Sequence, residues 1–213
     1  IDHEDESLAA RAMISCGIRQ NASTAAQLAE LLSESSKERK AAAAASLILM
    51  EDTSATQANE TINKMLFDKD ESTQLAALSS VGHISGILSD EGLAKLLNDD
   101  SPDVRSRAAQ LAEERSDESL MSPLVKNLDD PHTLPAARRA LKSFDESTVA
   151  DKLGNVLNDE ETSATLLIGA VRTLSDYRDH ADLEKIIEQG SSDELDLTKE
   201  VVDSLLKLAR QSP

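Results

Sequence analysis

The fold of this chain is decided by residues 96–105, which read Leu-Leu-Asn-Asp-Asp-Ser-Pro-Asp-Val-Arg. Two leucines end one predicted helix, an acidic turn follows, and a second helix begins near Pro102. Asp and Asn side chains in such a turn can accept bonds from the exposed backbone N–H groups of the next helix. A proline suits the first helical turn because its missing N–H is not needed there, and Pro131 stands at the corresponding place one copy later. The stretch therefore predicts a helix–turn–helix unit.

The same phrase recurs along the chain at nearly constant spacing. Its last apolar residue stands at six positions, 29 to 34 residues apart: Leu32, Leu66, Leu97, Leu128, Leu157 and Ile187. Internal repetition of this period is typical of repeat architectures, in which each unit buries its apolar face against its neighbours. The spacing therefore predicts an array of short repeats.

Each unit divides into a short first helix with one apolar stripe and an Ala-rich second helix. We predict an all-α chain with about six helix pairs after an N-terminal helix over residues 7–19, in a single domain over residues 1–213. The predicted repeats are residues 23–53, 54–88, 89–115, 116–145, 146–178 and 179–213. The first-helix stripes are Leu28, Leu31 and Leu32; Ile62, Met65 and Leu66; Leu93, Leu96 and Leu97; Leu124, Val125 and Leu128; Leu153, Val156 and Leu157; and Leu183, Ile186 and Ile187.

Composition agrees with thin layers of closely packed helices. Aromatic residues make up 1% of the chain and Trp is absent, whereas the run over residues 41–45 is all Ala, the best helix former. We expect this run to allow close helix packing. Gly and Pro number only 7 and 5, which is too few for a turn-rich all-β fold.

The formal net charge of −18 bears on possible partners and compartments. Such a chain should repel nucleic acid and anionic membranes, so its acidic surface is either simply solvated or faces a cationic partner. No apolar run reaches the length that spans a bilayer, and residues 1–6 resemble no secretory signal. We expect a soluble monomer, with the cytoplasm favoured. Because the chain lacks an initiator Met, it can also be a fragment or a mature form, which leaves the periplasm open.

One phrase carries a family resemblance. Residues 100–105, Asp-Ser-Pro-Asp-Val-Arg, followed by Ala108 and Ala109, resemble the second half of a HEAT repeat, in the short bacterial variety also described as phycobilisome-lyase-type. Residues 70–82 are a weaker copy. The resemblance implies a right-handed superhelix whose second helices line the concave side, and a scaffold that binds other proteins. It also implies that Arg105 pairs with a turn carboxylate, such as Asp130 or Asp100, and so links adjacent repeats.

Reactive side chains do not converge in the sequence. His3, His83, His132 and His180 lie far apart without zinc-ligand spacing, and we expect them on the surface. The lone Cys16 is expected to be buried on an apolar face with Leu8 and Ala12. No Gly-rich phosphate loop occurs, and the acidic turns lack calcium-loop spacing. We therefore predict no catalytic residue, cofactor or metal.

The leading hypothesis is a non-catalytic protein–protein interaction scaffold. The alternatives are a regulatory or accessory domain of a larger enzyme or membrane protein and, less favoured by the residues, a lyase-like enzyme. The candidate partner-binding groove is formed by Arg105, Arg107, Arg138 and Arg139, on successive second helices. Between Ser101 and Phe144 basic and acidic residues balance at 7 each. The groove could thus accept an acidic peptide, or its arginines could simply neutralise nearby turns.

Overall fold

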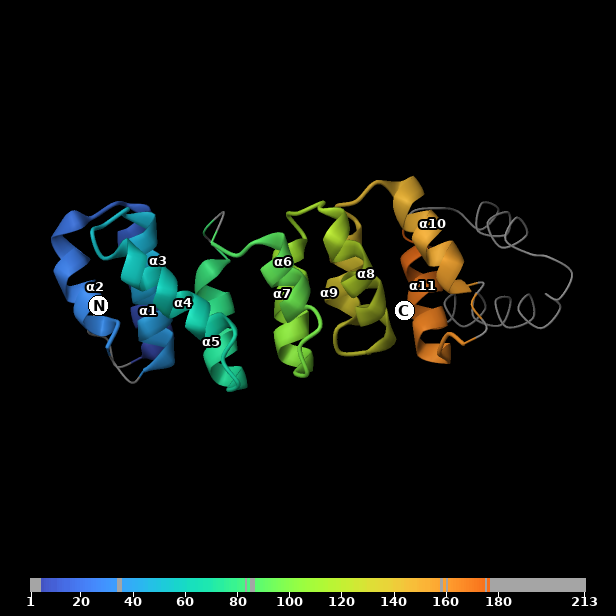
Figure 1. The fold of residues 1–213 in the computed structure, drawn as a ribbon, viewed down its shortest axis with the longest axis horizontal. Helices are drawn as coiled ribbons and strands as arrows, with labels where there is room; N and C mark the ends of the chain where they lie inside the picture. The colour runs from blue at the N-terminus through green and yellow to red at the C-terminus, as the bar shows by residue number, and fades with distance from the viewer. Residues whose placement is uncertain are drawn as a thin grey trace, which may run out of the picture. The chain divides into compact units, whose positions relative to one another are not determined.

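The computed structural model describes residues 5–33, 36–82, 84, 87–157, 159, 161–174 and 176, and these residues form helices without any strand (Figure 1). This confirms the predicted all-α class. The helices are α1 (Glu6–Ile18), η1 (Ala22–Thr24), α2 (Ala25–Leu31), α3 (Lys37–Leu49), α4 (Ala55–Leu66), α5 (Glu71–Val81), α6 (Asp90–Leu96), α7 (Pro102–Ala112), α8 (Glu118–Lys126), η2 (Asn127–Asp129), α9 (Leu134–Leu141), α10 (Glu146–Leu157) and α11 (Ala164–Leu174).

These helices follow the predicted alternation of a first and a second helix. The pairs within the described residues are α2 with α3, α4 with α5, α6 with α7, α8 with α9, and α10 with α11. The predicted helix over residues 7–19 is α1. The predicted repeat over residues 179–213 lies outside the described residues. The apolar stripes are confirmed where they are described, since Leu28, Ile62, Leu93, Leu124 and Leu153 are all fully buried.

One second helix begins later than predicted. Pro131 lies in the turn, and α9 begins only at Leu134, with Pro135 in its first turn. The delay has a local cause: the buried Thr133 hydroxyl donates to the carbonyl of Asn127 at 2.6 Å and holds the turn closed. Pro135 is tolerated because the first-turn N–H groups of a helix have no intrahelical acceptor.

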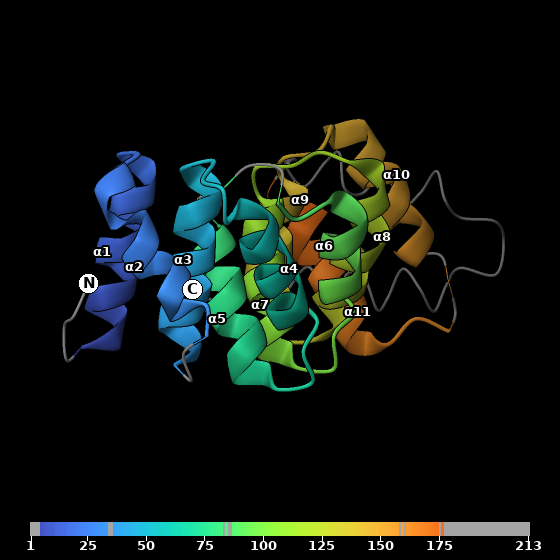
Figure 2. The ribbon, with the colours of Figure 1, turned by 60° about the vertical axis from the view of Figure 1, so that its left-hand side comes forward.

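The described chain forms two compact units, Ile1–Gly92 and Leu93–Pro213. In the first, α3 is the central helix and packs against α1, α2, α4 and α5; Figure 2 shows it between α1 and α5. Seven consecutive residues of α3, from Ala41 to Leu47, are fully buried. Successive helical residues point about 100° apart, so a buried run of this length means that α3 is enclosed on every side. The expected close packing of the Ala run is confirmed.

The contact between α1 and α3 depends on a glycine. The buried stripe of α1 is Ala9, Met13 and Gly17, and a Cβ atom at Gly17 would lie 2.7 Å from the Cα atom of Ser46. This stripe corrects the prediction for Cys16: the thiol is only half-buried, and Leu8 is 49% exposed. The helix turns its smallest residue, rather than its apolar residues Leu8 and Cys16, toward α3.

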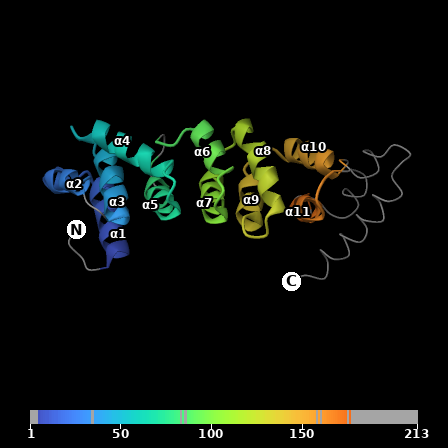
Figure 3. The same ribbon diagram turned by 60° about the horizontal axis from the view of Figure 1, so that its bottom comes forward.

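In the second unit the helices form two rows. Figure 3 shows α7, α9 and α11 in one row and α8 and α10 in the other. Small residues again permit close approach, because a Cβ atom at Gly169 of α11 would lie 2.5 Å from the carbonyl oxygen of Leu128. The contact brings α11 close to η2, and the second helices α7 and α9 pack against each other.

Turn residues cap the helices as their chemistry predicts. Asp70 is the N-cap of α5, and its carboxylate accepts bonds from the Thr73 N–H at 2.8 Å and from the Lys37 Nζ at 2.6 Å. These bonds, with Lys37 the largest contributor, lower the pKa of Asp70 well below its usual value. Asp117 and Asp145 also have lowered pKa values, chiefly because the hydroxyls of Ser119 and Ser147 donate to them.

Gly17→Ala tests the close contact of α1 with α3. In an open helix the exchange would stabilise the protein by about 1 kcal/mol. Here the new Cβ atom meets backbone, so we expect the free energy of unfolding to fall by about 1–3 kcal/mol. Urea unfolding followed by circular dichroism measures this free energy. The exposed Ser15→Ala serves as the control, and a stabilised Gly17→Ala protein would contradict the packing.

Asp70→Asn tests the capped turn between α4 and α5. Because the pKa of Asp70 is lowered on folding, its stabilisation is fully present above the unfolded pKa and is lost as the pH falls through the folded pKa. We expect the variant to unfold at lower urea concentration than the wild type at pH 7. The difference should narrow progressively below about pH 4. A difference that is constant between pH 7 and pH 2 would rule out this ionised cap.

Candidate protein-binding surface

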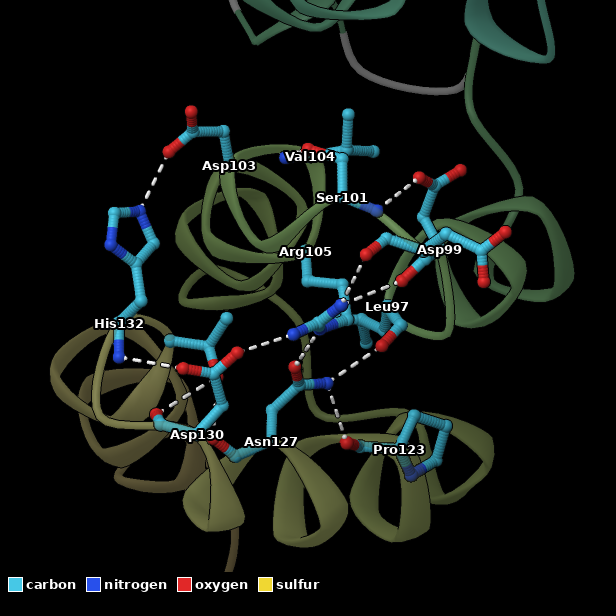
Figure 4. A network of polar contacts seen from close by, with 12 residues as sticks. Leu97, Asp99, Ser101, Asp103, Val104, Arg105, Pro123, Asn127, Asp130 and His132 are labelled. Atoms are coloured by element: carbon cyan, nitrogen blue, oxygen red, sulfur yellow. Dashed lines mark hydrogen bonds and ion pairs between the residues drawn. The ribbon is translucent and has the colours of Figure 1, made fainter. Parts of the chain in front are cut away.

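The candidate surface starts from the first turn of α7. Ser101 is the N-cap, with its hydroxyl accepting from the Val104 N–H at 3.3 Å, and Pro102 opens the helix. Val104 is fully buried, and this anchors the turn. Asp103 and Arg105 flank Val104; Figure 4 shows Asp103 directed toward His132 and Arg105 toward Asn127 and Asp130.

Arg105 turns back onto the loop that precedes its own helix. Its Nη1 donates to the carbonyl oxygens of Asp99 at 2.8 Å and Asp100 at 3.0 Å. Asp99 and Asp100 lie in the turn between α6 and α7, where backbone carbonyls have no helical partner and need another donor. The guanidinium therefore closes the turn within its own repeat.

The same guanidinium also joins the next repeat. Its Nε donates to Asn127 Oδ1 at 3.0 Å, and its Nη2 forms an ion pair with Asp130 at 2.5 Å (Figure 4). This confirms the predicted pairing of Arg105 with Asp130, whereas Asp100 contributes its backbone carbonyl rather than its carboxylate. The Arg105 side chain is only 18% exposed, so its role is structural.

Asn127 is a residue of this network that the sequence did not single out. It is buried, and its Nδ2 donates to the carbonyls of Leu97 at 2.7 Å and Pro123 at 2.9 Å. An amide supplies both the donors and the acceptor that this position needs. The sequence carries one signal for this role: Asn127 lies between the apolar residues Val125 and Leu128, where a buried helix residue is expected.

His132 adds a second link between the repeats. Its Nε2 lies 2.6 Å from Asp103 Oδ1, and both side chains are more than half exposed. The surface position predicted for His132 is confirmed. His3, His83 and His180 lie outside the described residues.

The other three predicted arginines have distinct surroundings. Arg107 donates to Gln110 Oε1 at 2.7 Å on its own helix α7. Arg139 of α9 forms an ion pair with Glu113, just after α7, at 2.8 Å. Arg138 reaches the end of α11, where its Nη2 donates to the Arg172 carbonyl at 3.1 Å and to Asp176 at 2.8 Å.

Four cations lie on or directly after the second helices α7 and α9. We call Arg107, Arg138, Arg139 and Lys142 the arginine face. Lys142 shares Asp176 with Arg138, at 3.5 Å, so that carboxylate serves two cations. Arg105 does not belong to the face, because its donors are used inside the turns.

Charge is unevenly divided between the two kinds of helix. Among the described helices, the second helices α3, α5, α7, α9 and α11 carry eight Lys and Arg against three Asp and Glu. The first helices α2, α4, α6, α8 and α10 carry four against seven. In a chain of net charge −18, this concentrates cations on the second helices. The division is strongest in the second unit, where five arginines accompany a single carboxylate, Asp103, on α7, α9 and α11.

The described residues form neither a metal-binding cluster nor a membrane-spanning helix. They contain no group of three or more His, Cys, Asp or Glu side chains that could hold a metal ion. None of their helices is long and apolar enough to cross a bilayer. The open pocket of about 350 Å³ between the turns is lined by Arg105, Asn127 and the surrounding polar residues, so it is the solvent side of the network already described.

The comparison with known families concerns the middle of the chain. The family model for HEAT repeats matches residues 90–165, which contain all four predicted arginines. No curated protein matches the chain.

Arg105→Ala tests the interlock between the two turns. It removes an ion pair and leaves buried carbonyl and amide groups without their donor, so the free energy of unfolding should fall by about 1–3 kcal/mol. Arg105→Lys should recover only part, because an ammonium cannot reach all four acceptors. The control is Arg139→Ala, whose exposed ion pair contributes about 0–1 kcal/mol. Equal losses for the two Ala variants in urea unfolding would contradict the interlock.

Proposed function

We propose that this chain is a non-catalytic scaffold that binds a protein partner on the solvent-exposed side of α7 and α9. Its residues 90–165 match HEAT repeats. HEAT repeats commonly mediate protein–protein interaction, which supports the class of function. The surface and its residues are our own assignment.

The observation that carries the proposal is the arginine face itself. If the surface of a chain with net charge −18 were only solvated, its cations would not be expected to concentrate on one row of helices. The side chains of Arg139 and Lys142 are 52% and 51% exposed, so a partner can reach them. Arginine is also enriched among the residues that dominate binding energy at protein interfaces.

The predicted groove residues take different roles in this proposal. Arg107 and Arg139 contact the partner, and Arg138 supports the face through Asp176. Arg105 is a positioning residue, since it holds the turns that set α7 against α9. Removal of Arg105 should therefore affect stability first and binding second.

The double variant Arg107→Ser, Arg139→Ser tests the proposal. The purified full chain is immobilised, and the proteins captured by the wild type and the variant are quantified by mass spectrometry. A specific partner should fall by about tenfold, because each exchange removes a charge-assisted hydrogen bond to the partner.

The control has the same change of charge on the first unit: Arg11→Ser, Arg19→Ser, both exposed on or next to α1. It should capture the partner as the wild type does. Equal capture by both double variants would remove the arginine face from the binding surface.

A further inference from the structure

We propose that the arginine face takes an extended protein segment rich in Asp and Glu, and that a carboxylate of this segment replaces Glu113 on Arg139. The inference rests on the proposed scaffold function and adds the chemistry of the partner. It follows from the balance of charges at the face and from the exposure of one ion pair.

The cations of the face exceed the carboxylates that serve them. Glu113 pairs with Arg139, and Asp176 is shared by Arg138 and Lys142. Arg107 has Gln110 as its partner and forms no ion pair within the described residues. Among the described residues, four cations thus meet two carboxylates, so an incoming carboxylate finds positive charge that their ion pairs do not neutralise.

The ion pair of Arg139 with Glu113 shows what kind of group the face accepts. Its side chains are 52% and 34% exposed, so water reaches both partners. Exposed ion pairs contribute little net free energy, because each side chain is nearly as well solvated alone. A carboxylate from a partner can therefore take the place of Glu113 at small cost, and Glu113 acts as a competitor held within the chain.

The acidic surface outside the arginine face limits where such a segment can bind. Repulsion between an acidic peptide and the acidic turns is screened beyond about 8 Å at physiological salt, so short-range contacts at the face decide the binding. Docking elsewhere places like charges together and is disfavoured. A nucleic acid is the less suitable polyanion, because its continuous phosphates would extend past the face onto the acidic turns.

Two adjacent variants distinguish competition by Glu113 from a general change of charge. Glu113→Gln frees Arg139, whereas Glu114→Gln removes the same charge from a neighbouring exposed residue that forms no ion pair within the described residues. The probe is a short fluorescent peptide that alternates Glu with Ala, titrated with the full chain and followed by fluorescence anisotropy. We expect Glu113→Gln to bind it about two- to fivefold tighter than the wild type, the equivalent of one exposed ion pair. Glu114→Gln should change the affinity by less than about twofold.

Further measurements test whether the face selects acidic peptides. Arg107→Ser, Arg139→Ser should weaken peptide binding by about tenfold or more. The same peptide with Lys in place of Glu should not bind at the face. Equal affinities for Glu113→Gln and Glu114→Gln, binding of the Lys peptide that the arginine double variant weakens, or stronger binding of an oligothymidylate than of the Glu peptide would each overturn the inference.

Failure here is distinguishable from failure of the scaffold function. If the arginine double variant loses a captured partner but no Glu peptide binds, the scaffold proposal stands and the acidic class of partner is wrong. If capture is unchanged in the double variant, the arginine face is not the binding surface, and the inference falls with it.

Discussion

The contacts of Arg105 are the interaction on which the repeat arrangement of the second unit depends. The turn between α6 and α7 contains backbone carbonyls that have no helical partner and need donors from elsewhere. Arg105 provides those donors to Asp99 and Asp100 and uses its remaining nitrogens on Asn127 and Asp130 of the next repeat. One side chain therefore satisfies a turn and couples it to its neighbour. The planar guanidinium, with five donors in fixed directions, suits this task as no other side chain does.

The first unit meets the same requirement with a different residue. Gln74 is the fourth residue of α5, as Arg105 is of α7, and its buried amide donates to the carbonyl of Leu66 at 3.5 Å. The link to the neighbouring repeat is there made by Lys37 and Asp70. The repeats thus share a constraint rather than a sequence, which explains why only one copy carries the full Asp-Val-Arg phrase.

This use of Arg105 also shapes the candidate binding surface. A residue with four of its five donors engaged inside turns has little to offer a partner, so the proposed surface consists of residues farther along α7 and α9. Arg107, Arg139 and Lys142 remain accessible there, while Glu113 and Asp176 limit but do not cancel their charge. In the proposed function, stability and recognition are therefore assigned to different arginines of α7 and α9.

Sequence reasoning succeeded where the determinants are local or periodic. The repeat spacing and the buried first-helix stripes were predicted because they depend on apolar residues at regular offsets along the chain. The pairing of Arg105 with Asp130 was implied by the resemblance to HEAT repeats. The exposure of Leu8, the buried amide of Asn127 and the partners of Arg138 and Arg139 were not predicted. These depend on which side of a helix its neighbour approaches, and close contacts such as Gly17 on Ser46 decide that. Size complementarity at one position outweighed the apolar pattern of α1.

The enclosure of α3 has a consequence for how the first unit opens. A helix that is buried all round from Ala41 to Leu47 has no solvent-facing edge from which it can fray. Its amide protons can exchange with deuterium only when the surrounding helices α1, α2, α4 and α5 separate from it. Local and global opening are therefore the same event for this segment, and α3 should define the slowest-exchanging amides of its unit.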